Sequence, residues 1–220
     1  ELKFCENPQL LAIESNAFKV FGIESFHIPE SLQELKDGWC IHTAFLNEIT
    51  ISEKNKNFGF LDSDKKIVVG KSNNENEIFD VITFACRNVK NVSIPSFITA
   101  IHSGAFSECA DLNYIEFSDD SKLQYIGKYT FSQSSVKNIC IPKNVEIVGK
   151  AAFLYCDVLF SFEALAEDFT FPDILFSNCK RIKIMAFPNA YKIHRIKNAF
   201  SCFSSTQDII LFICSNALID

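Results

Sequence analysis

Cysteine and histidine are the residue types of this chain that could support chemistry. The sequence contains nine cysteines and four histidines, which are His27, His42, His102 and His194. Such side chains bind zinc in short clusters such as C-x-x-C or H-E-x-x-H, but neither motif occurs and the histidines are scattered. An odd number of cysteines also cannot close completely into intramolecular disulfides. We therefore expect no metal site and no cofactor.

Four of the cysteines keep a nearly constant distance from a phenylalanine. Cys109, Cys156, Cys179 and Cys202 lie two or three residues after Phe106, Phe153, Phe176 and Phe200, and the last three cysteines are 23 residues apart each time. Free cysteine packs as a small apolar group, so this spacing predicts a buried column of free thiols beside the phenylalanines. Thiols one repeat apart would also approach disulfide distance, so the spacing alone leaves bridges open.

The phenylalanines themselves recur at a regular interval. With Trp39 counted as an equivalent, the aromatic anchors are Phe18, Trp39, Phe84, Phe106, Phe131, Phe153, Phe176 and Phe200. The intervals between them are 21, 45, 22, 25, 22, 23 and 24 residues. All but one fall within the length of a leucine-rich repeat, about 20 to 29 residues. The long interval indicates one unit plus an insertion at about residues 53–77, with an expected hairpin at 58–71 followed by a polar loop.

Each unit also contains a short segment that alternates apolar and polar residues, as a strand buried on one face does. These segments are residues 26–28, 49–51, 92–94, 115–117, 139–141, 160–162 and 185–187. Proline directly follows four of them and must end the strand, because it has no backbone N–H for a ladder. Between the strand and the next anchor, apolar residues lie three to five apart, which predicts short helical or irregular crossovers.

One such unit is too short to bury its own apolar face, so stacked copies must create the core. The sequence therefore predicts a single α/β-type repeat solenoid over residues 1–220, of about eight coils. Each coil is expected to contribute one short parallel strand.

Two segments carry a resemblance to a known family. They are IPSFITAIHSGAFSECADLNYIEF and KLQYIGKYTFSQSSVKNICIPKNVEIVGKAAFLYC, and they resemble the BspA-like class of leucine-rich repeats, whose unit is similar to I-P-x-x-V-x-x-I-G-x-x-A-F-x-x-C-x-x-L-x-x-I. The chain departs from this unit at Trp39 and at Ser134, where a cysteine is expected. The resemblance implies a leucine-rich-repeat fold and a role in adhesion or recognition, as in cell-surface proteins of mucosa-dwelling bacteria and protist parasites. It does not imply an enzyme.

The middle residue of each strand is expected to point away from the core, and an extended surface of this kind is where solenoids bind. We choose Tyr114, Glu116 and Asn138, together with the adjacent Cys140, as candidate binding residues, since tyrosine is enriched at interface hot spots. Cys140 should be the most accessible repeat cysteine, with Glu116 and Ser161 as its neighbours. No histidine is expected on either adjacent strand to act as its base, so we predict no catalytic residue. The inserted hairpin is a second exposed feature where recognition could occur.

Charge and hydropathy limit the class of partner. A net charge of −6 and a pI near 5.3 lack the basic footprint that nucleic-acid binding requires. No apolar run approaches the length of about 20 residues needed to span a membrane.

The chain begins at Glu1 rather than Met, as a mature or excised fragment would. Asn91-Val92-Ser93 is a glycosylation sequon at a strand start, and the sequence leaves its occupancy open.

Two hypotheses for the function remain. The first is a non-enzymatic module at the cell surface, or secreted, that binds a host, matrix or partner protein. The alternative is a cytoplasmic leucine-rich-repeat scaffold, in which free cysteines persist because the compartment is reducing.

Overall fold

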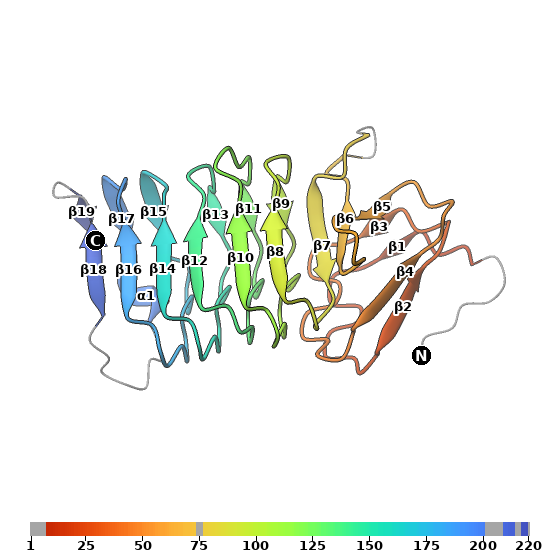
Figure 1. Cartoon of the computed structure of the whole chain (residues 1–220), viewed down its shortest axis with the longest axis horizontal. Helices are drawn as coiled ribbons and strands as arrows, with labels where there is room; N and C mark the ends of the chain where they lie inside the picture. The colour runs from red at the N-terminus through yellow and green to blue at the C-terminus, as the bar shows by residue number, and fades with distance from the viewer. Residues whose placement is uncertain (1–7, 74–76, 201–208, 214–216, 220) are drawn as a thin grey trace.

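The chain winds into an elongated solenoid of about eight coils (Figure 1). The computed structural model describes residues 8–73, 77–200, 209–213 and 217–219. Each coil places one strand in a front sheet and one in a second sheet, and a loop closes the third side. The solenoid predicted from the repeats is confirmed.

The front sheet consists of four-residue strands that alternate buried and outward-facing residues. They are β2 (Ser25–Ile28), β4 (Glu48–Ile51), β8 (Asn91–Ile94), β10 (Tyr114–Phe117), β12 (Asn138–Ile141), β14 (Ser161–Ala164), β16 (Ile184–Phe187) and β18 (Ile210–Ile213). Neighbours pair in parallel within three groups: β2 with β4, β8 with β10, and β12 to β18. Figure 1 shows β8 to β18 as a row of parallel arrows, with β2 and β4 at an angle to it.

The second sheet uses shorter strands. They are β1 (Ala12–Ile13), β3 (Glu34–Leu35), β7 (Val81–Ala85), β9 (Ala100–Ile101), β11 (Tyr125–Ile126), β13 (Ile147–Val148), β15 (Asp168–Thr170), β17 (Lys192–His194) and β19 (Leu218–Ile219). A hairpin of β5 (Phe58–Phe60) and β6 (Ile67–Gly70) joins this sheet, because β6 pairs antiparallel with β7. The hairpin predicted in 58–71 is thus an added part of the sheet.

One strand of the front sheet lies two residues away from its predicted place. The sequence indicated a strand at 160–162 with Ser161 in its outward middle position. In the structure, Phe162 and Ala164 face the core, while Phe160 is 46% exposed. The outward middle residue of β14 is therefore Glu163. The segment F-S-F-E-A fits the alternating pattern in two registers, and burial of Phe162 against its neighbours selects one of them.

The crossovers on the third side are not helical, and here the helical part of the prediction is wrong. Among the described residues the only α-helix is α1 (Ile196–Ala199). In the loops, alternate N–H groups bond to different coils: Ser132 N donates within its own loop to Tyr129 O, while Phe131 N donates to Ala152 O of the next coil at 2.8 Å. A helix would use all of these donors internally.

Left-handed residues make this pattern possible. Most loops contain two residues with φ between 53° and 73°, four positions apart: Asn16 and Val20, Gly38 and His42, Gly104 and Glu108, Tyr129 and Gln133, Ala151 and Tyr155, Ile174 and Asn178. Such residues interrupt a right-handed helix. The apolar spacing of three to five residues therefore reflects this repeated loop and not a helical turn.

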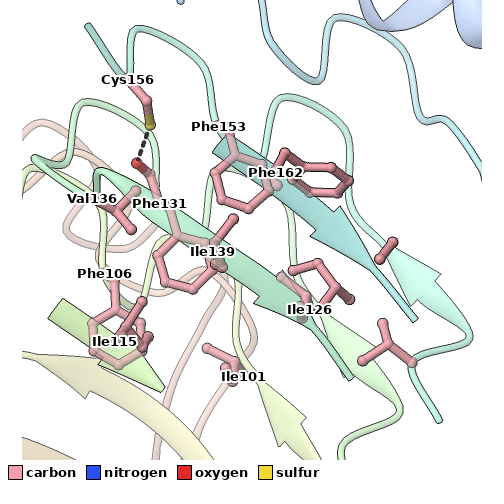
Figure 2. Packing of buried hydrophobic residues seen from close by; sticks show 14 of the residues in the cluster. Ile101, Phe106, Ile115, Ile126, Phe131, Val136, Ile139, Phe153, Cys156 and Phe162 are labelled. Carbon is pink, nitrogen blue, oxygen red and sulfur yellow. Dashed lines mark hydrogen bonds between the residues drawn. The ribbon is translucent and has the colours of Figure 1, made fainter. Parts of the chain in front are cut away.

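The aromatic anchors form two stacks inside the solenoid. Phe106, Phe131 and Phe153 lie 5.4 and 5.2 Å apart, with ring planes inclined by only 10° (Figure 2). Phe176 and Phe200 continue this stack at 5.8 and 5.6 Å. A fully buried phenylalanine stabilises the fold by about 2 to 3 kcal/mol. The stack is thus a principal source of stability in coils that could not fold alone.

The other stack lies in the N-terminal coils. Trp39 packs against Phe18 at 5.8 Å and against Phe84 at 5.7 Å, and its indole N–H donates to Thr83 O. The buried residues accordingly divide into an N-terminal cluster, which contains Phe84, and a C-terminal cluster, which contains Phe106.

Three of the cysteines predicted beside the anchors, Cys109, Cys156 and Cys179, are buried. The thiols of Cys156 and Cys179 donate to the carbonyl oxygens of Phe131 and Phe153 in the preceding coil, at 3.0 and 2.9 Å (Figure 2 shows the first). Cys109 lies 3.8 Å from Cys86 O. Cys40, Cys86, Cys109, Cys140, Cys156 and Cys179 are free thiols, whereas Cys202 lies outside the described residues. Cys109, Cys156 and Cys179 thus each form a hydrogen bond to the backbone of the preceding coil in place of a bridge.

The two clusters meet where one coil lacks its loop. In other coils the anchor follows the second-sheet strand by four to six residues, as Phe106 follows Ile101 by five, but Phe84 lies within β7 itself. Loops 36–43 and 102–109 therefore touch directly. Asp37 accepts hydrogen bonds from the N–H and the hydroxyl of Ser103, at 2.5 and 2.8 Å.

Arg87 fills the remaining space at this junction. It is only 3% exposed, and its guanidinium lies over the Phe84 ring at 4.5 Å. It donates to five backbone carbonyl oxygens, those of Cys40, Thr43, Ala85, Gly104 and Ala105. The buried cation is thus satisfied by peptide dipoles from both clusters.

Candidate binding surface on the front sheet

Two rows of outward side chains run across the front sheet, one from the first and one from the third residue of each strand. From β8 onward, the first row is Asn91, Tyr114, Asn138, Ser161, Ile184 and Ile210, and the second row is Ser93, Glu116, Cys140, Glu163, Ala186 and Phe212. The rows are polar over β8 to β14 and apolar over β16 and β18.

A groove of about 620 Å³ lies over the middle of these rows, from β10 to β16. Its lining includes Tyr114, Glu116, Asn138, Cys140 and Glu163. The candidate residues chosen from the sequence are therefore brought together in one concave surface. Their role in binding is a proposal that we develop below.

Glu116 is held in place by two hydroxyl groups. Ser93 Oγ donates to Glu116 Oε1 at 2.6 Å, and the Tyr114 hydroxyl donates to Glu116 Oε2. These bonds, that of Ser93 first, lower the pKa of the Glu116 carboxyl below its ordinary value. The same contact raises the pKa of Tyr114. Glu116 is thus a fixed negative charge with a tyrosine beside it.

Cys140 is exposed, but its surroundings suppress its reactivity. Burial of the sulfur raises the pKa of the thiol, and the neighbouring Glu163 carboxylate raises it further, to about 12. In the register of the sheet, Cys140 lies opposite Glu163. Ser161, which we had expected beside it, is instead opposite Asn138 and donates to that amide oxygen at 2.7 Å.

The groove crosses a seam in the front sheet. β10 ends one paired group and β12 begins the next. In neighbouring coils the residue after the strand bonds to the previous coil, as Ser118 N does to Ile94 O and Leu165 N to Ile141 O. Pro142 occupies this position after β12 and has no N–H to donate. The absent bond removes one contact between β12 and β10 at the seam, whereas β16, which Pro188 follows in the same way, still pairs with β14.

Within the described part of the chain, no group of three or more histidine, cysteine, aspartate or glutamate side chains is arranged to hold a metal ion. The described helices likewise include none that is long and apolar enough to cross a membrane.

A family model for the BspA type leucine rich repeat region matches residues 2–61 and 76–210, with 6 copies of the repeat. The chain belongs to the BspA-type leucine-rich repeat family. Repeats of this family generally serve as non-enzymatic modules for protein–protein interaction. In this BspA-type chain the aromatic and thiol positions of the repeat are the buried columns described above.

Solved structures show the same fold. A leucine-rich repeat protein from Eubacterium ventriosum has a TM-score of 0.69 at 18% identity, over 92% of this chain and 54% of that one. A leucine rich cell surface protein from Faecalibacterium prausnitzii gives 0.56 at 21% identity, over 89% and 55%. A leucine-rich repeat protein from Bacteroides ovatus gives 0.54 at 20%, over 96% and 48%.

This BspA-type chain spans about half the length of the solved proteins that it matches. No curated protein matches its sequence significantly.

The sequence reasoning missed Glu163 and the apolar end of the groove. Glu163 could have been found from the repeat itself. Phe162 lies 23 residues after Ile139, which is one repeat length, whereas Phe160 lies only 21 residues after it. Phe162 is therefore the equivalent of Ile139, and Glu163 is the equivalent of Cys140. The hydrogen bond from Ser93 to Glu116 had no local signal, because Ser93 is 23 residues away in the sequence.

Proposed function

We propose that this chain is a non-enzymatic recognition module that binds another protein through the groove on its front sheet, at the cell surface. The observation that supports this most directly is an uncovered sheet whose central groove gathers a half-exposed tyrosine, a carboxylate held by two hydroxyl groups and an amide. Tyrosine and such polar groups are suited to protein recognition. The surface location is supported by membership in the family and by the Faecalibacterium prausnitzii neighbour, which is described as a cell surface protein.

Peptide display provides the binding test. A random library of extended peptides is selected on the purified chain, and the selected peptides are measured against Tyr114→Ala and Asn138→Ala. Tyr155→Ala is the matched control, because Tyr155 is 49% exposed and Tyr114 is 52% exposed but Tyr155 lies in a loop on the third side. We expect only the groove variants to lose binding, by about tenfold or more. Selected peptides that bind all variants equally, or no selection above background, would contradict the proposal.

Location is tested separately. Antibodies against this chain should stain intact cells that express the complete gene product, before permeabilisation. Staining that requires permeabilisation would instead support a cytoplasmic scaffold, the alternative that is favoured by the free thiols of the described cysteines.

A further inference from the structure

The charged groups that line the groove are mainly acidic. They are Glu116, Asp119 and Glu163, with Lys143 as the opposing cation. Within the described residues, neither Glu116 nor Glu163 forms an ion pair with a basic side chain. Both carboxylates are therefore free to attract a cation from outside.

Glu116 and Glu163 lie in the same outward row, with Cys140 between them. Glu163 is opposite Cys140 in the register, and β10 and β14 lie on either side of β12. Two strand spacings are roughly 9 to 10 Å, and an extended peptide in the polyproline II conformation rises about 3.1 Å per residue and returns to the same face every three residues. A peptide that crosses the strands would therefore place one side chain over each carboxylate when these two side chains are about three residues apart in the peptide.

Beyond Glu163 the groove becomes apolar. Ile184 and Ala186 form this end of its lining, and Ile210 and Phe212 continue the two rows with more than half of each side chain exposed. A peptide that continues in the same direction would thus pass from acidic to apolar surface, where an apolar side chain would be buried.

Resting on the proposed function, we propose that the partner is a protein with an extended segment that carries two basic residues about three positions apart, followed by an apolar residue. The basic groups lie over Glu116 and Glu163. The apolar side chain packs on Ile184 and Ala186. Charge steers the segment into the groove, and the apolar contact fixes its direction.

The display selection described above tests this directly. Selected peptides should be enriched in lysine or arginine with this spacing. A synthetic peptide of the selected sequence should bind Glu116→Gln and Glu163→Gln about fivefold to tenfold more weakly than the parent chain, and binding should weaken between low and high salt. Glu146→Gln, an exposed acid near the second sheet, is the matched control.

Charge reversal gives a sharper result. Glu163→Lys should abolish binding of the basic peptide, and a peptide with glutamate at the matching position should restore it. Circular dichroism should show that all variants remain folded. If the peptides depend on Tyr114 but show no basic enrichment and no effect of Glu116→Gln or Glu163→Gln, this inference fails while the proposed function stands. If no peptide depends on the groove, both fail.

Discussion

The guanidinium of Arg87 bonds to both oxygens of Thr43, donating from Nε to the carbonyl at 3.1 Å and from Nη2 to the hydroxyl at 3.0 Å. The two residues are 44 positions apart. Thr43 belongs to the loop that follows Trp39, and Arg87 follows β7. This contact joins the N-terminal and C-terminal clusters at the coil that has no loop of its own. The junction between the two clusters thus combines this buried side chain with the contact between Asp37 and Ser103.

Replacing Arg87 by methionine should destabilise the fold by about 3 kcal/mol, because several buried carbonyl groups lose their donor. Urea unfolding followed by circular dichroism measures this. Arg87→Lys should recover only part of the loss, because an ammonium has fewer donors than the planar fork. Lys180→Met is the control: its ion pair with Asp157 is largely exposed, so the change should stay within about 0.5 kcal/mol. An Arg87→Met protein as stable as the parent would show that the junction does not depend on the guanidinium.

The aromatic stack should be equally sensitive. Phe131→Ala should lower the free energy of unfolding by about 3 to 5 kcal/mol, since Phe131 is fully buried between Phe106 and Phe153. Thermal unfolding of Phe97→Ala supplies the comparison, because Phe97 is 42% exposed and its truncation should cost about 1 kcal/mol or less. Similar losses for both variants would be inconsistent with the stack as the main support.

Cys140 should react slowly despite its exposure. A rise in the pKa of the thiol from 9.0 to about 12 reduces the thiolate fraction at pH 8 by nearly a thousandfold. Mass spectrometry of the Cys140 peptide after iodoacetamide treatment measures the rate. Glu163→Gln should accelerate alkylation severalfold by removing the nearby charge. Reaction of Cys140 in the native chain as fast as in the unfolded chain would contradict this account.

A left-handed valine offers a route to higher stability. Val20 has φ 58° and is 70% exposed, and a β-branched residue is strained in this region. Val20→Asn should raise the stability by on the order of 1 kcal/mol, because asparagine tolerates this conformation. Ile147→Asn is the comparison, as Ile147 is 55% exposed but lies in β13 without a positive φ. A gain in Tm for both variants would show that removing an exposed apolar group, and not backbone strain, is responsible.

His102 should make the stability depend on pH. Burial lowers its pKa below the ordinary value of 6.5, although Asp37 and Glu34 oppose this, and its Nδ1 has no hydrogen-bond partner among the described residues. As the pH falls below about 6.5, the unfolded chain takes up a proton that the native chain excludes, so stability is lost. Denaturation midpoints at pH 7.5 and 5.5 test this. His102→Asn should have a smaller drop, and an unchanged drop would exclude His102 as its source.

The sequence alone determined the repeating part of this protein. The columns of Phe106, Phe131 and Phe153, the thiols beside them and the outward positions of Tyr114 and Glu116 all follow from local spacing. A residue type that recurs every 22 to 25 positions lies beside the equivalent residue of the next coil, so the sequence spacing already indicates which residues are neighbours in the tertiary structure.

The tertiary structure decided what breaks the repetition. The contact of Arg87 with Thr43 and the entry of the hairpin into the second sheet join residues that no periodic spacing relates. The seam at β12 interrupts a pairing that the repeat spacing predicts. Alternation alone fits two registers around Glu163, and burial of Phe162 in the core selects the one that pairs Glu163 with Cys140. Alternate N–H groups of the loops also bond to the next coil and not within the loop, because left-handed residues and stacked neighbours together outweigh the helical spacing of the apolar residues.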